Sequence, residues 1–286
     1  MINKISYLGT LAFFIVLLTM PLGHAAMILM EQLFGIKYIY YAAIILGIIG
    51  FILLIIGYKT ANETIATFYG LFAGLAIWTG WIEFSFVYFA KRYHIQPLIE
   101  NSEIVTKPEY LLLPSSIGFL VVLLLNLLFN SNIRCNFFNW LKRRFKIQRG
   151  KSENIKNRSV AMITAIELIM ILWTFYIVLL LAYDNSIFGD KHPITYIIAF
   201  GSLLWSVYLF MKLMRIKKLG FAIRYAIPTV IIFWNFVEIL GRWNIFKEIW
   251  VHPLQYWFEM LLVTIIFIAL VIISSYERTR QVKINR

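Results

Sequence analysis

The chain has 286 residues, of which 61% are hydrophobic and 17% aromatic, and its mean hydropathy is +0.77. A soluble core of this size cannot enclose so much apolar surface, so lipid must solvate the protein. Membrane topology accounts for the formal net charge of +13, so we expect no nucleic-acid partner, and the single cysteine, Cys135, excludes an internal disulfide.

Eight apolar stretches follow one another along the chain. Each is about long enough to cross roughly 30 Å of hydrocarbon at about 1.5 Å per helical residue. The stretches are continuous rather than alternating, which disfavours a lipid-facing barrel. The sequence therefore predicts an all-α integral membrane protein with eight transmembrane helices, near residues 5–29, 38–57, 64–90, 110–130, 160–183, 193–213, 221–241 and 256–275.

The basic residues predict the orientation of these helices. With eight spans and the N-terminus inside, 20 of the 27 lysines and arginines fall on the inner side. Lysine and arginine accumulate on the cytoplasmic side whatever the function of a membrane protein. We therefore expect both termini in the cytoplasm, and the bacterial cytoplasmic membrane as the location.

A basic segment divides the chain into two halves of four helices. The predicted units are residues 1–131, a cytoplasmic linker at 132–158, and residues 159–286. The first part of the linker mixes aromatic and basic residues, as does an amphipathic helix that lies among anionic lipid headgroups. The alternative is that this linker is a docking surface for a protein partner.

Two similar segments favour an internal duplication. Residues 77–83 read IWTGWIE and residues 232–238 read IFWNFVE, although their alignment needs a gap of one residue. Both segments place a glutamate in the outer part of the third helix of their half. Because each half has an even number of spans, the repeat would be parallel, with a pseudo-twofold axis along the membrane normal.

Glu83 and Glu238 are the strongest candidates for a functional site. An ionisable side chain within a span costs about 2.5–3.5 kcal/mol on insertion scales and usually faces the protein interior or water. Trp78 and Trp81 could hold Glu83 by hydrogen bonds. For Glu238 the alternative is a local ion pair with Arg242, which lies four residues further along the same helix. These five residues form the predicted binding site for a ligand or a proton.

The histidines extend this site toward a metal. All four histidines fall on the outer side of the predicted topology, with His24 inside the first span and His94 and His252 just beyond the third and seventh spans. Imidazole with carboxylate suits zinc or iron, and imidazole with thioether suits copper. The chain has no local metal-binding motif, so distant helices would have to assemble the site. The predicted ligands are His24, His94, His252, Glu83 and Glu238.

Three functional hypotheses remain open at this point. The first is that the protein binds a metal ion or a small polar ligand on the extracytoplasmic side, between the two halves, with its transport left open. The second is a non-catalytic subunit or scaffold. The third is a membrane-embedded, metal-dependent oxidoreductase. Phosphate loops and the GxSxG nucleophile motif are absent from the sequence.

Overall fold

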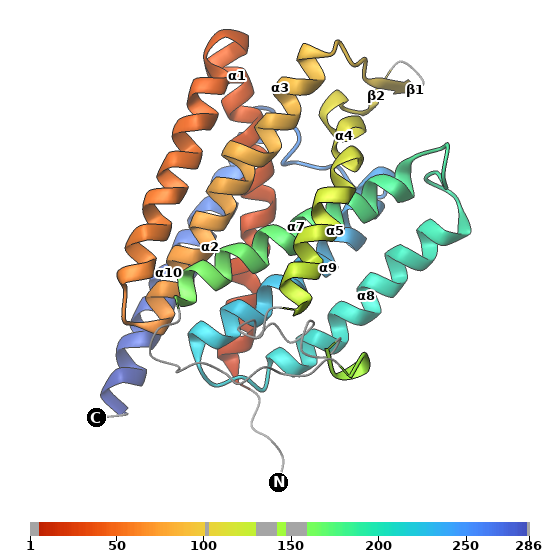
Figure 1. The fold of residues 1–286 in the computed structure, drawn as a ribbon. Coiled ribbons are helices and arrows are strands. Elements are labelled where there is room, and N and C mark those ends of the chain that lie inside the picture. Colours follow the sequence, from red (N-terminus) through yellow and green to blue (C-terminus); the bar gives the residue numbers. More distant parts are fainter. Residues whose placement is uncertain (1–5, 101–102, 130–141, 147–158, 285–286) are drawn as a thin grey trace.

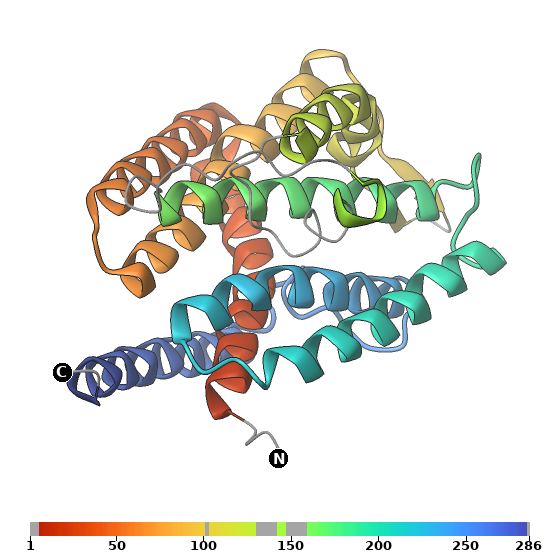
Figure 2. The same cartoon turned by 60° about the horizontal axis from the view of Figure 1, so that its bottom comes forward.

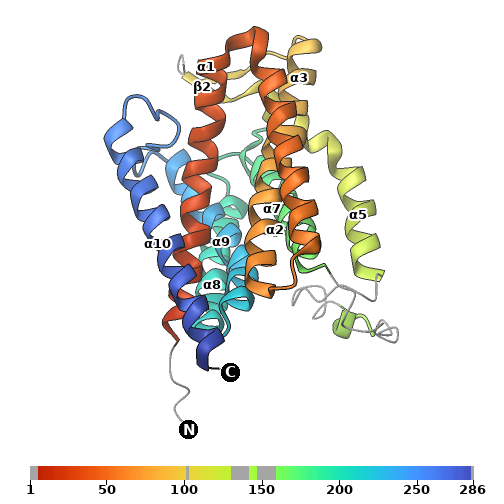
Figure 3. The same cartoon turned by 90° about the vertical axis from the view of Figure 1, so that its left-hand side faces the viewer.

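The computed structural model describes residues 6–100, 103–129, 142–146 and 159–284. Within them, eight helices are long and apolar enough to cross a membrane, which confirms the predicted helical class and the number of spans. Both ends of the chain lie at the same end of the bundle (Figure 1, Figure 3). Most of the predicted linker at 132–158 lies outside the described residues.

Helix α1, Tyr7–Lys59, supplies the first two spans. The backbone breaks at Gly35, where φ is 56° and ψ is −175°. A positive φ favours glycine because it has no Cβ. The break turns α1 into two antiparallel arms that meet at the end of the bundle furthest from the termini (Figure 1).

The third span contains three consecutive helical segments. Helix α2, Glu63–Ile77, is preceded by its N-cap residue Asn62, whose side chain accepts hydrogen bonds from two backbone N–H groups. A π-helix, η1, follows at Trp78–Glu83, and α3 continues at Phe84–Arg92. The π-helix lies where the sequence predicts a site.

A short antiparallel hairpin lies between the third and fourth spans. Its strands are β1, Leu98–Glu100, and β2, Glu103–Thr106. The fourth span then consists of α4, Pro108–Leu112, a 3-10 turn, η2, Leu113–Ser116, and α5, Ile117–Phe129.

The second half is more regular. Its four spans are α7, Val160–Tyr183, α8, Pro193–Leu213, α9, Leu219–Arg242, and α10, Trp257–Ile284. The first arm of α1 lies between the α2 and α7 pair on one side and α9 and α10 on the other (Figure 2). The core lies among α1, α2, α7 and α9, where Ile15, Leu71, Leu168 and Ile223 are fully buried.

Candidate functional site

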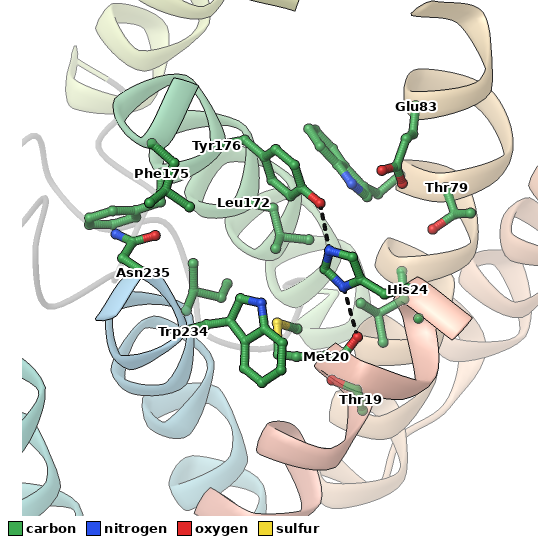
Figure 4. Close-up of a pocket in the computed structure, with 15 residues that line it drawn as sticks. Thr19, Met20, His24, Thr79, Glu83, Leu172, Phe175, Tyr176, Trp234 and Asn235 are labelled. Carbon is green, nitrogen blue, oxygen red and sulfur yellow. Dashed lines mark hydrogen bonds between the residues drawn. The ribbon is translucent and has the colours of Figure 1, made fainter. Parts of the chain in front are cut away.

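Four helices enclose a small cavity. Side chains from the first arm of α1, from α2 with η1, from α7 and from α9 line a volume of about 50 Å³. His24, Glu83, Tyr176, Trp234 and Asn235 are among these side chains (Figure 4). A water molecule needs about 10–15 Å³ of such space, so the cavity has room for a few waters or a ligand of a few atoms.

His24 is held in one tautomer. Its Nδ1 lies 3.0 Å from the carbonyl oxygen of Met20, which can only accept, so Nδ1 carries the proton. Its Nε2 lies 3.0 Å from the hydroxyl of Tyr176. In the neutral ring Nε2 is an acceptor, so the Tyr176 hydroxyl donates to it (Figure 4). These two hydrogen bonds fix the orientation of the imidazole ring.

Glu238 lies beside the same imidazole. Its Oε1 is 3.6 Å from Nε2 of His24 and accepts a hydrogen bond of 2.6 Å from Nε1 of Trp234. Trp234 and Glu238 are four residues apart in α9, so they share one face of the helix. If Nε2 of His24 takes up a proton, Glu238 is the nearby carboxylate that stabilises the imidazolium.

Glu83 lies at the end of the π-helix with its carboxylate toward the cavity (Figure 4). Its side chain is 6% exposed, and His24 interacts with it electrostatically. Trp78, at the start of the same π-helix, also lines the cavity. Glu83 and His24 thus line one cavity, and Glu238 contacts His24 from beside it.

Asn235 adds a buried amide to the lining. Its side chain is 2% exposed, and its Nδ2 has no hydrogen-bond partner among the described residues. A buried donor without a partner costs about 1–3 kcal/mol. Because Asn235 lines the cavity, a polar atom inside the cavity could satisfy this donor.

A third acid, Glu248, comes from the loop between α9 and α10. Burial, and then the negative charge of Glu238, raise the pKa of Glu248 to about 7 against the opposing effects of His24 and Arg242. The carboxylate lies in the notch left by Gly241, where an added Cβ would overlap it. Hydropathy does not single out Glu248 as a candidate site residue, because it lies outside the spans, where glutamates are common.

Arg242 and Trp81 lie away from the cavity. The Nε of Arg242 donates to both carboxylate oxygens of Asp190 at 3.1 Å, so the local ion pair considered for Glu238 is replaced by a pair with the α7–α8 loop. Trp81 is 40% exposed and donates to the carbonyl of Ile44 on the second arm of α1.

His94 and His252 are exposed residues of turns and do not line the cavity. Over the described ranges, no group of three His, Cys, Asp or Glu side chains is arranged to hold a metal ion. The copper, zinc or iron site therefore stays a prediction: of its five ligands, Nε2 of His24 lies 3.6 Å from Oε1 of Glu238, and Glu83 lines the same cavity as His24.

The fold and the cavity define the class of the protein as an all-helical polytopic membrane protein with a small cavity in its core, mainly apolar but lined also by His24, Glu83 and Asn235. No protein-family model, curated protein or solved structure matches the chain.

Proposed function

We propose that the protein binds a small cation, of the size of ammonium or a short protonated amine, in the cavity between its two halves. The observation that carries the proposal is a group of acids near His24: Glu83 lines the cavity, Oε1 of Glu238 lies 3.6 Å from Nε2 of His24, and Glu248 interacts electrostatically with both His24 and Glu238. Carboxylates within a bundle favour a cation, since an uncompensated charge there is costly.

The cations near the cavity already pair with other acids. Lys107 Nζ lies 3.5 Å from Glu31 and 3.9 Å from Glu109, and Arg242 pairs with Asp190. Lys107 also interacts electrostatically with Glu83, and Arg242 with Glu248, so these cations compensate part of the charge of the acids near the cavity, and protons or a bound cation would compensate the rest.

The shape and lining of the cavity fit the same class of ligand. Trp78, Trp234 and Phe175 present aromatic rings to it, and a cation over such a ring gains about 0.5–2 kcal/mol. The volume of about 50 Å³ admits only a ligand of a few atoms.

By the distribution of basic residues, the ligand would enter from the extracytoplasmic side. We do not extend the proposal to transport, because apolar side chains fill the bundle between the cavity and the end where the termini lie. These include the buried Ile15, Leu71, Leu168 and Ile223.

The test is calorimetric titration of the purified protein in detergent with ammonium, methylammonium, sodium and zinc chlorides. We expect one of the monovalent amines to bind, and Glu83→Gln and Glu238→Gln each to weaken it by roughly tenfold or more, equal to about 1.4 kcal/mol. Tight stoichiometric zinc binding with no amine binding would instead support the predicted metal site.

Glu259→Gln is the matched control. It removes the same charge from an exposed position in the first turn of α10, so we expect the affinity to stay unchanged. The proposal fails if no probe binds, or if the double variant Glu83→Gln, Glu238→Gln binds as tightly as the wild type.

A further inference from the structure

We infer that the cavity consists of two pseudo-equivalent half-sites, related by a twofold axis that passes between them. One half-site is His24 with Trp234 and Glu238, and the other is Tyr176 with Trp78 and Glu83. The binding experiment that tests the half-sites rests on the proposed function, whereas the pairing of residues that defines the half-sites does not.

The π-helix explains the one-residue gap between the two similar segments. In an α-helix, residues four apart share a face, whereas the wider turn of a π-helix places residues five apart in that relation. Trp234 and Glu238 are four apart in α9, and Trp78 and Glu83 are five apart within η1. The extra residue therefore lies in the π-helix, which returns Glu83 to the register of Glu238.

The register before the π-helix fits the same relation. The alignment that pairs Trp78 with Trp234 also pairs Leu75 with Ile231 and Thr79 with Asn235, and all six residues line the cavity. It further pairs every buried residue of α2 with a buried residue of α9. These pairs are Ala66 with Ala222, Thr67 with Ile223, Gly70 with Ala226, Leu71 with Ile227, Ala73 with Thr229 and Gly74 with Val230.

Helices α1 and α7 obey a second register of the same kind. Pairing His24 with Tyr176 pairs six of the eleven buried residues of the first arm of α1 with buried residues of α7, and the other five with half-buried ones. The six buried pairs are Gly9 with Ala161, Ala12 with Thr164, Val16 with Leu168, Met20 with Leu172, Ala25 with Ile177 and Met27 with Leu179. Both registers are supported by which residues are buried, and this support does not depend on similarity between the paired residue types.

Equivalent residues also touch one another, as they must beside a twofold axis. His24 and Tyr176 share a hydrogen bond of 3.0 Å. At the other end of the bundle, a Cβ on Gly220 would lie 3.1 Å from the Cα of its counterpart, Thr64. The packing partners exchange in the same way: α1 packs against α9 as α7 packs against α2, and α10 packs against α1 as α5 packs against α7.

The two half-sites place their rings alike. The centroids of His24 and Trp234 are 6.1 Å apart, and those of Tyr176 and Trp78 are 5.8 Å apart. The difference between the half-sites is then chemical: one holds an imidazole and the other a phenol. Exchanging the two side chains moves the imidazole across the axis, from Glu238 to Glu83, and keeps the composition of the cavity.

The test compares His24→Tyr, Tyr176→His and the exchange variant His24→Tyr, Tyr176→His by methylammonium titration and thermal unfolding. We expect His24→Tyr to lower the affinity by roughly tenfold, and the exchange variant to return within about threefold of the wild type. The melting temperature should fall in both single variants and recover in the exchange variant, because the imidazole and phenol again face each other.

The control is the double variant His24→Tyr, Tyr110→His. It moves the imidazole to position 110, where the native ring lies 5.9 Å from that of Tyr176, but which is not the pseudo-equivalent of position 24. Recovery in this control, or an exchange variant no better than His24→Tyr in both readouts, overturns the half-sites while leaving cation binding intact. Conversely, if the exchange variant recovers the melting temperature while neither the wild type nor any variant binds methylammonium, that result supports the half-sites and refutes the proposed function.

Discussion

Glu248 is a group near the site whose charge changes near neutral pH. Burial raises its pKa to about 7, and the acids and bases that face it are Glu238 and Arg242 from α9 and His24 from α1. Above that pH the loop between α9 and α10 carries an additional negative charge beside Glu238. The negative potential that a bound cation meets therefore increases as the pH rises through about 7.

We expect methylammonium affinity to rise by roughly tenfold between pH 6 and pH 8, which corresponds to about 1.4 kcal/mol of added attraction. Glu248→Gln should remove this dependence and leave the affinity near its low-pH value. Titration calorimetry at several pH values measures both. An unchanged pH profile in Glu248→Gln would show that another group titrates.

The same group sets a pH dependence of stability. Because the folded-state pKa of Glu248 lies above the ordinary value of 4.5, the folded state holds the proton more tightly than the unfolded state. Its contribution to the free energy of unfolding is therefore complete below about pH 4.5 and is lost as the pH rises through about 7.

Gly241→Ala tests the position of Glu248 without changing its charge. The new Cβ would occupy the place of the carboxylate, so Glu248 must move toward water and its pKa must fall. We expect the binding affinity to lose its pH dependence near neutrality, as in Glu248→Gln. Gly201→Ala is the control, since a Cβ there meets nothing within 4 Å. Retention of the wild-type profile by Gly241→Ala would exclude this position for Glu248.

The sequence indicates only those members of the site that are unusual in a membrane span. Glu83, Glu238 and His24 were predicted because ionisable groups in hydrocarbon require a partner. Tyr176 and Asn235 were not, because neither tyrosine nor asparagine in a span singles out one neighbour over another. Their roles follow from distances between α7, α1 and α9, which hydropathy does not encode.

At the scale of the element, three glycines at similar predicted depths have different surroundings. A Cβ on Gly80 would lie 2.5 Å from the backbone nitrogen of Gly47 and 2.6 Å from the carbonyl oxygen of Ala43, whereas Gly23 and Gly118 have open space. Among these three, Gly80 alone lies where a missing side chain permits close helix contact.

Gly80→Ala should accordingly destabilise the contact between η1 and the second arm of α1. We expect a cost of about 1–3 kcal/mol, typical of overpacking, seen as a melting temperature several degrees lower in detergent. Gly118→Ala changes the same atoms without a clash and should leave the melting temperature unchanged. Equal melting temperatures for the two variants would contradict the close approach at Gly80.

The helices themselves were largely predictable, and their irregularities were not. Continuous hydrophobicity defines a span, so all eight predicted stretches coincide with helices of the structure. The π-helix at Trp78–Glu83 and the break at Gly35 leave hydropathy unchanged. In the sequence, only the one-residue gap between the two similar segments relates to the π-helix. Interpreting that gap requires the burial patterns of α2 and α9, which the sequence does not contain.

On the scale of the whole molecule, both termini lie at one end of the bundle, and the α7–α8 loop lies at the other (Figure 1). The even number of spans requires this arrangement. The positive-inside rule adds the direction, because most basic residues belong to the end that holds the termini. The predicted cytoplasmic location of the termini thus implies an extracytoplasmic α7–α8 loop.

Single cysteines introduced in a Cys135→Ser background test this orientation. Ser186 is exposed in the α7–α8 loop and Arg215 is exposed between α8 and α9, so the length of α8 separates them. We expect a membrane-impermeant maleimide to label Ser186→Cys in intact spheroplasts, and Arg215→Cys only after the membrane is permeabilised. The opposite pattern would invert the protein, and would then place the α7–α8 loop in the cytoplasm.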